Sequence, residues 1–270
     1  MSQDVTLLEG LLPHRVRWAQ AVIPVLPADP AAAEQAYPEA IEAGLFPEER
    51  EHVARAVAKR RVEFAAVRRC ARQALHELGY PPVPILPGEH REPQWPDGVV
   101  GSMTHCAGYC AAAVARSGEV SALGIDAEVH AALPEGVLDL ISLESERALL
   151  AELTGRRPGS VHWDRVLFSA KESVYKAWFP LTRRWLGFEQ ADIELRVDGT
   201  FEARLIDTEE TAPPAAPPNG SAPASAPSPS PSAASPSASA SAPSGIPRGF
   251  AGRWAVSGGL IATAIGEVVR

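Results

Sequence analysis

A segment that cannot build a core, residues 211–249, sets the strongest limit on how this chain folds. It consists mainly of alanine, proline and serine, and it contains no aromatic residue. Such a composition buries too little apolar surface to offset the entropy lost on ordering. We therefore expect a disordered loop, partly in polyproline II conformation.

The patterns on both sides of this segment predict that it interrupts one sheet. Residues 193–205 alternate between apolar and polar side chains around a turn at Asp198 and Gly199, and residues 254–265 alternate around a turn at 257–259. Both patterns are typical of β-hairpins. Because the entropy of loop closure rises only slowly with length, a long loop between strands is tolerated. We predict an insertion within a sheet, not a tether between domains.

The composition and charge of the chain exclude several classes. Its 270 residues are 46% hydrophobic, enough for one large or two small cores, and its net charge of −8 argues against a general nucleic-acid binder. Three cysteines fit a reducing compartment. The sequence shows neither a signal peptide nor an apolar run of roughly 20 residues. We expect a cytoplasmic monomer that binds neither nucleic acid nor membrane.

A long helix is predicted over residues 47–79, with proline near its start and glycine at its end. Its apolar stripe comprises Val53, Val57, Phe64, Val67, Ala71, Leu75 and Leu78. Arg60 and Arg68 fall on or beside this stripe. Either they extend to its edge, or they hold an anion together with neighbouring elements, since a buried arginine needs a partner. Arg61, Arg69 and Arg72 are predicted to be solvated.

The sequence "LGIDAE" places two carboxylates close together. Residues 120–128 alternate as a strand, so Asp126 and Glu128 project to the same side. They repel unless a cation lies between them or both stay solvated. Gly124, on the same face, is expected to leave open space beside them. An all-oxygen pair suits Mg²⁺; the alternative is a solvated strand face with ordinary acids.

The helix predicted over residues 166–179, "VLFSAKESVYKAWF", carries charges among apolar residues. Glu172 and Lys176 are four residues apart, which allows a helix salt bridge worth roughly 0.3–0.5 kcal/mol. Alternatively, if this helix packs over the 120–128 strand, Glu172 completes a three-carboxylate site. Lys176 would then lie beside any bound phosphate. The sequence pattern assigns no role to Lys171.

A histidine follows the first of two strands predicted at residues 99–102 and 110–114. His105 lies near Cys106 and Cys110, but a zinc site lacks a fourth ligand. A contact with phosphate and a structural role both remain open. Walker, G-x-S-x-G, H-E-x-x-H and G-x-G-x-x-G motifs are absent, which disfavours P-loop kinases, α/β hydrolases, zincins and Rossmann dehydrogenases.

Four motifs together resemble one family. "KRRVEFAAVRRCA", "GSMTHC", "LGIDAE" and "FSAKESVYKAWFPLTRRWLGF" occur in this order within about residues 60–191. The chain resembles the 4′-phosphopantetheinyl transferases, most of all the enterobactin-synthase-component-D-like, surfactin-type branch. The resemblance implies an α/β (α+β) fold of two similar halves, a pseudo-dimer, at residues 1–118 and 119–270. Each half would be a small antiparallel sheet packed with a helix, and the active site would lie between them.

The resemblance also implies a site and a reaction. Mg²⁺, with Mn²⁺ able to replace it, would be held by Asp126, Glu128 and Glu172. Glu172 and Lys176 would be catalytic. Coenzyme A would be bound by Arg60, Arg68, Ser102, His105, Tyr175 and Lys176. The implied reaction transfers the 4′-phosphopantetheine arm of coenzyme A to a serine of an apo acyl or peptidyl carrier protein, releasing adenosine 3′,5′-bisphosphate. The pathways implied are fatty acid, polyketide, nonribosomal peptide and siderophore biosynthesis.

Two other functions would use the same residues. A Mg²⁺-dependent nucleotide pyrophosphohydrolase is the alternative enzyme. A non-catalytic coenzyme A or carrier-binding module is disfavoured by the intact carboxylates and Lys176.

The family pattern "ILKG" is "ILPG" here, so Pro87 replaces a lysine that helps to hold the 3′-phosphate, and His90 and Arg91 are the candidates to replace it. "PLTRRWLGF" is predicted either to dock the carrier protein or to be a structural hairpin.

Overall fold

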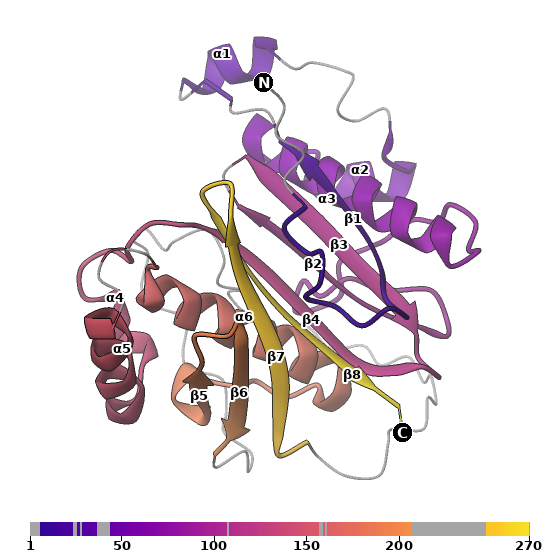
Figure 1. The fold of residues 1–270 in the computed structure, drawn as a ribbon. Coiled ribbons are helices and arrows are strands. Elements are labelled where there is room, and N and C mark those ends of the chain that lie inside the picture. The colour runs from indigo at the N-terminus through magenta and orange to yellow at the C-terminus, as the bar shows by residue number, and fades with distance from the viewer. Residues whose placement is uncertain are drawn as a thin grey trace.

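The computed structural model describes residues 6–23, 26–27, 29–36, 44–106, 108–156, 159, 161–206 and 247–269. Two antiparallel sheets, with strand orders β1-β3-β2 and β4-β8-β7-β6-β5, form the framework of the molecule (Figure 1). This confirms the predicted fold class. The predicted loop at 211–249 lies, apart from its last three residues, outside the described residues.

The first half is a three-stranded sheet with one long helix packed on it. Its elements are β1 (Arg17–Val22), α1 (Pro30–Ala36), α2 (Pro47–Val53), α3 (Ala58–Glu77), β2 (Val99–Cys106) and β3 (Tyr109–Arg116). Helix α3 packs against β1 and β3 (Figure 1). Its buried residues Ala71 and Leu75 join Ile85 and Val114 in one hydrophobic cluster.

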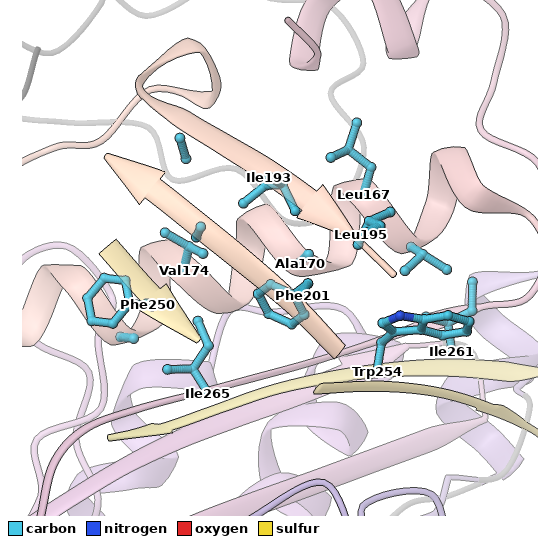
Figure 2. Packing of buried hydrophobic residues seen from close by; sticks show 14 of the residues in the cluster. Leu167, Ala170, Val174, Ile193, Leu195, Phe201, Phe250, Trp254, Ile261 and Ile265 are labelled. Carbon is cyan, nitrogen blue, oxygen red and sulfur yellow. The ribbon is translucent and has the colours of Figure 1, made fainter. Parts of the chain in front are cut away.

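The second half is a five-stranded sheet with its own long helix. Its elements are β4 (Val120–Val129), α4 (Val137–Ile141), α5 (Glu144–Arg156), α6 (Trp163–Thr182), a 3₁₀-helix (Phe188–Gln190), β5 (Ala191–Leu195), β6 (Thr200–Leu205), β7 (Gly249–Ser257) and β8 (Leu260–Val268). Helix α6 packs on β4 and β8. Figure 2 shows its side chains meeting those of the sheet; the labelled residues are Leu167, Ala170, Val174, Ile193, Leu195, Phe201, Phe250, Trp254, Ile261 and Ile265.

The insertion between β6 and β7 joins neighbouring strands. Phe201 of β6 pairs with Gly252 of β7 in an antiparallel ladder. The hairpins β5–β6 and β7–β8 form at the predicted turns, although Val197 lies outside β5. The prediction that the long insertion interrupts one sheet is therefore confirmed.

The long helix predicted over residues 47–79 is wrong, because the chain breaks at residues 54–57 into α2 and α3. No proline or glycine marks the break, and Val57, expected in the core, is 67% exposed. The break lets α2 bring Glu49 against α3, where Arg72 Nη1 lies 2.8 Å from its Oε1. Arg72 is therefore ion-paired and not solvated as predicted. This tertiary contact outweighs the helix propensity of the intervening residues.

A buried glutamate recurs in each half at the same structural position. Glu49 on α2 and Glu146 on α5 are 0% and 1% exposed. Each carboxylate accepts a hydrogen bond from the backbone N–H three residues earlier. Each also accepts one from the backbone N–H of an isoleucine beyond the long helix, Ile85 and Ile193, at 2.8 Å.

Each buried glutamate is neutralised by a cation from the long helix beside it. Lys171 of α6 lies 2.8 Å from Glu146 Oε2 and donates to the Phe188 carbonyl. This contact supplies the role that Lys171 lacked. Because both ions of a buried pair have lost their hydration, removing one partner leaves a costly unpaired charge. The repeated glutamates support the two-halves architecture at the level of single side chains.

The two halves meet where β2 packs alongside β4. Ser102 Oγ accepts a hydrogen bond from the backbone N–H of Ile125, and Thr104 Oγ1 accepts one from that of Ala127, both at 3.0 Å. Both hydroxyl residues are buried. Strand β2 is longer than predicted and includes His105, which therefore lies within the strand and not after it. No helix in the described ranges is long and apolar enough to cross a membrane.

Candidate active site

Helix α6 lies directly on strand β4 because β4 carries a glycine at the crossing. A Cβ placed on Gly124 would lie 2.0 Å from the carbonyl oxygen of Ser173, far inside van der Waals contact. The expectation of open space at Gly124 is therefore wrong, since the helix backbone fills it. Glycine here permits a close approach of backbones, which brings the α6 side chains to the "LGIDAE" strand.

Asp126 and Lys176 form the central contact of the site. Lys176 Nζ lies 2.7 Å from Asp126 Oδ1 and also donates to the Ile125 carbonyl at 3.1 Å. Thr104 Oγ1 donates to the same Asp126 oxygen at 3.2 Å. Asp126 Oδ2, by contrast, is buried without a hydrogen-bond partner in the described part of the chain. Lys176 thus pairs with Asp126 across the helix–strand contact, in place of a simple i,i+4 bridge to Glu172.

Glu128 is held by an arginine that the sequence patterns did not single out. Arg165, in the first turn of α6, donates from Nη1 to Glu128 Oε2 at 3.1 Å. The two side chains are 16% and 18% exposed. The i,i+4 rule did not find this pair, because 37 residues separate its members.

The charge of Asp126 contributes to raised pKa values of Glu128 and Glu172. Burial, followed by the charge of Asp126, raises the pKa of Glu172 to about 7. Burial and Asp126 likewise raise the pKa of Glu128 to about 7, although Arg165 opposes the shift. Both effects require that the three acids lie near one another. When all three carboxylates are ionised, the site holds one more negative charge than Lys176 and Arg165 neutralise.

These residues fit a hard divalent cation in their chemistry. The donors are carboxylate oxygens, one of them is buried without a hydrogen-bond partner among the described residues, and three carboxylates face two cations. Across the described residues, however, no three His, Cys, Asp or Glu side chains are arranged as a ready metal-binding group. Lys176 contacts one oxygen of Asp126 and Arg165 contacts one of Glu128, so these two oxygens are engaged by protein cations. The same finding gives no support to a zinc site at His105.

His105 lies in a polar cluster between β2 and α3. Its Nε2 is 3.4 Å from Arg60 Nη1 and 3.4 Å from Glu63 Oε2. Burial alone would raise the pKa of Glu63, but the hydrogen bond and charge of His105, with Lys59 and Arg60, lower it. Arg60 is exposed, not part of the apolar stripe. Arg60 and His105 are thus brought together, as a shared anion site requires.

Arg68 and Ser102 are buried and have partners within the protein. Arg68 Nε donates to the Ile85 carbonyl at 2.8 Å, its guanidinium lies 3.1 Å from the centre of the Phe64 ring, and Glu49 is 3.7 Å away. Burial lowers the pKa of Arg68 to about 9. These contacts explain its burial without an anion, as the bond to Ile125 does for Ser102. Their roles toward coenzyme A stay predictions.

The C-terminal end of α6 is an aromatic cluster in contact with the 86–94 loop. The Tyr175 ring centroid lies 5.3 Å from Trp185 and 5.7 Å from Phe179, and His90 packs edge-on to Phe179. Arg183 forms an ion pair with Glu92 of the loop. Pro87 and Pro93 form an isolated antiparallel β-bridge in this loop.

Two family models match the chain and define its class. The 4′-phosphopantetheinyl transferase N-terminal domain matches residues 48–115, and the 4′-phosphopantetheinyl transferase superfamily matches residues 122–218. The two matches cover the helix α3 region and the α6–β4 site respectively.

Individual relatives agree with this class. The chain is 50% identical over 222 residues to 4′-phosphopantetheinyl transferase Svp of Streptomyces mobaraensis, covering 82% of this chain and 78% of the relative. It is 50% identical over 196 residues to Npt of Nocardia iowensis, covering 69% and 86%. It is 37% identical over 126 residues to enterobactin synthase component D of Salmonella typhi, covering 44% and 49%. The chain belongs to the 4′-phosphopantetheinyl transferase superfamily, as predicted, and its predicted enzyme class is confirmed.

Proposed function

We propose that this chain catalyses the Mg²⁺-dependent transfer of 4′-phosphopantetheine from coenzyme A to a serine of a carrier protein, releasing adenosine 3′,5′-bisphosphate. The observation that carries the proposal is Asp126 Oδ2, which is buried without a hydrogen-bond partner in the described ranges and lies beside Lys176 and two further carboxylates. Family membership supplies the substrate class. The carboxylates and the lysine supply a place where a charged pyrophosphate can react.

Asp126, Glu128 and Glu172 are the residues that would hold the metal. When bound, the ion would neutralise charge on the pyrophosphate. Lys176 would donate a hydrogen bond to a phosphate oxygen, because its side chain is 27% exposed and needs only to turn from Asp126. Such a donor stabilises the charge that develops in the transition state.

Glu172 would take the proton of the serine hydroxyl. A general base must lie within reach of the proton that it abstracts, and Glu172 lies beside Asp126 and Glu128, where the pyrophosphate would bind. The serine oxygen would attack the β-phosphorus, and the bond from that phosphorus to the bridging oxygen would break. The electron pair of the broken bond leaves with adenosine 3′,5′-bisphosphate. If Glu172→Gln retained most of its kcat, this assignment would be wrong.

Arg60 and His105 would bind the phosphates of coenzyme A, since they meet at the edge between α3 and β2. Arg68, Ser102 and Tyr175 remain predicted contacts. His90 and Arg91 remain candidates for the 3′-phosphate in place of the lysine missing at Pro87. We also propose that the halves divide at residues 118–119, between β3 and β4, and that the enzyme is a cytoplasmic monomer.

Mass spectrometry of an apo carrier protein with coenzyme A and Mg²⁺ tests the reaction. We expect a gain of about 340 Da on the serine, the mass of the transferred phosphopantetheine group, and its loss in Asp126→Ala, which removes a metal ligand. Coenzyme A consumed while several carrier types stay unmodified would instead indicate a pyrophosphohydrolase. Binding without either change would indicate a non-catalytic module.

We further propose that the carrier protein docks at residues 180–188, beyond the end of α6. Arg183 is exposed there beside the Tyr175–Trp185 cluster, so the surface combines positive charge with apolar area. An acidic carrier surface would complement it. We expect Arg183→Glu/Arg184→Glu to raise KM for the carrier about tenfold and to change its salt dependence, whereas the exposed control Arg253→Glu leaves both unchanged. An unaltered KM in the double variant removes this docking surface.

A further inference from the structure

Arg165 makes three separate hydrogen bonds around the end of strand β4. Its Nε donates to the Ala131 carbonyl at 3.1 Å, its Nη2 to the Ala132 carbonyl at 2.9 Å, and its Nη1 to Glu128 Oε2 at 3.1 Å. Two contacts thus fix the guanidinium to the backbone that follows β4. The third extends to the carboxylate, so Arg165 holds Glu128 from an anchored position.

Without this contact, the Glu128 side chain would be free to turn away from Asp126 and into solvent. It projects from the same face of β4 as Asp126, two residues earlier, and two ionised carboxylates so placed repel one another. The next residue, Val129, is already 38% exposed, so solvent is close. Arg165 engages only Oε2 of Glu128, and Oε1 accepts no hydrogen bond from the described residues.

We propose that Arg165 is a positioning residue that keeps Glu128 beside Asp126 and leaves one carboxylate oxygen for the divalent cation. This rests on the proposed function, because it concerns the same metal site. Partners that fix the orientation of a ligand typically change metal affinity by 10- to 100-fold when they are replaced. Arg165 does not touch substrate in this assignment and acts through Glu128 alone.

Arg165→Lys separates positioning from charge. Lysine keeps the positive charge, so the electrostatic environment of the cation changes little. Its single ammonium cannot reproduce three donors held in a planar fork, and therefore it cannot bind both carbonyls and the carboxylate in the same geometry. An effect of this variant consequently reports the lost geometry.

The test titrates Mn²⁺ alone into the full chain and follows free Mn²⁺ by electron paramagnetic resonance. We expect Arg165→Lys to bind Mn²⁺ about tenfold more weakly than the wild type. In the transfer assay, the half-saturating Mn²⁺ concentration should rise equally. The kcat and the KM for coenzyme A at saturating Mn²⁺ should stay within about twofold, as expected when only the metal ligand is misplaced.

A matched control and a double variant identify the route of the effect. Arg147→Lys, in α5, removes a similar guanidinium that is anchored on the Ser142 carbonyl and hydroxyl and not on Glu128, and it should leave Mn²⁺ affinity unchanged. In a Glu128→Ala background, Arg165→Lys should weaken Mn²⁺ binding by less than twofold further, since its target is gone. Thermal unfolding of all variants detects any general loss of folding.

Three results would overturn the inference while the wild type still binds Mn²⁺ and modifies the carrier. One is an unchanged Mn²⁺ affinity in Arg165→Lys. Another is a raised KM for coenzyme A at unchanged Mn²⁺ affinity, which would make Arg165 a substrate contact. The third is an undiminished effect in the Glu128→Ala background. If the wild type neither binds Mn²⁺ nor modifies any carrier, the proposed function itself fails, and this inference fails with it.

Discussion

Replacing Lys176 by methionine should tighten metal binding and yet remove activity. Lys176 Nζ lies 2.7 Å from Asp126 Oδ1, so its positive charge repels a cation bound at the other carboxylate oxygen and competes with a cation that also needs Oδ1. Methionine keeps a similar length and flexibility without the charge. The two consequences have opposite signs, which makes the variant a sharp test of the site.

The size of the binding effect follows from the contact. Two unit charges about 4 Å apart interact by about 4 kcal/mol at an effective dielectric constant near 20. The Lys176 side chain is 27% exposed and can swing away, so water screens part of this energy. We expect about 1.4 to 2.8 kcal/mol, or 10- to 100-fold tighter binding of Mn²⁺ alone.

The transfer reaction of Lys176→Met should fall by about 100-fold or more at saturating Mn²⁺, the usual cost of losing one charge-stabilising donor. Mn²⁺ affinity is measured by electron paramagnetic resonance and transfer by mass spectrometry of the carrier. Lys59→Met is the control for Mn²⁺ binding alone, because Lys59 is 70% exposed and its ion-pair partner is Glu63, which is not one of the three carboxylates of the site. Unchanged or weaker Mn²⁺ binding would refute the competition between Lys176 and the cation. Transfer near the wild-type rate would refute its catalytic role.

Three further predictions concern the fold around the site. In EDTA, the unfolding temperature should fall as pH rises from 5 to 8, because the folded-state pKa values of Glu128 and Glu172 are about 7, above their ordinary 4.5. The stability that these two groups contribute is fully present below pH 4.5 and is lost as the pH rises through 7. We expect the free energy of unfolding to fall by a value on the order of 2 kcal/mol. An unfolding temperature that rises with pH would contradict this expectation. Glu146→Gln should lower the free energy of unfolding in urea by about 3 kcal/mol, because it leaves Lys171 charged and buried without its partner. Full stability in that variant would show that the pair is dispensable. Gly124→Ala should lower the free energy of unfolding by about 2 kcal/mol or more, since its methyl group meets the α6 backbone. An unchanged free energy of unfolding, measured by chemical denaturation, would show that the helix can move aside.

The periodic elements could be predicted because their signals are local. Alternation over residues 120–128 and around both hairpin turns needs only neighbouring residues, and all three patterns formed strands. The break between α2 and α3 could not be predicted in this way. It depends on Glu49 reaching Arg72, a contact across 23 residues in a stretch with no helix breaker. Glu49, three residues after Phe46, marks where α2 begins, since such side chains cap the backbone, but it does not mark where α2 ends.

The site residues show the same difference between local signals and tertiary contacts. Asp126 and Glu128 share a strand face, which periodicity predicts, and a family resemblance was needed to bring Glu172 and Lys176 to them. Arg165 carried no signal, because its partner lies on another element. Gly124 was misinterpreted for a related reason. A glycine without a side chain indicates either open space or a close backbone approach, and the packing of α6 decides which.

Strand register shows how the two halves correspond residue by residue. Asp126 pairs with Thr263, the fourth residue of β8, and Ala19 of β1 pairs with Ala112, the fourth residue of β3. Both β3 and β8 directly follow the turn of a hairpin. Ala19 is therefore the structural counterpart of Asp126.

By the same register, Ala21 corresponds to Glu128, so the first half has methyl groups where the second half has carboxylates. Ala19 is 4% exposed and belongs to the hydrophobic cluster beneath α3. The buried glutamates of α2 and α5, in contrast, persist in both halves. A scaffold contact that each half needs for folding is thus present twice. The repelling acids, whose charge destabilises the fold unless a cation is bound, are present once, on the strand that β2 and α6 enclose.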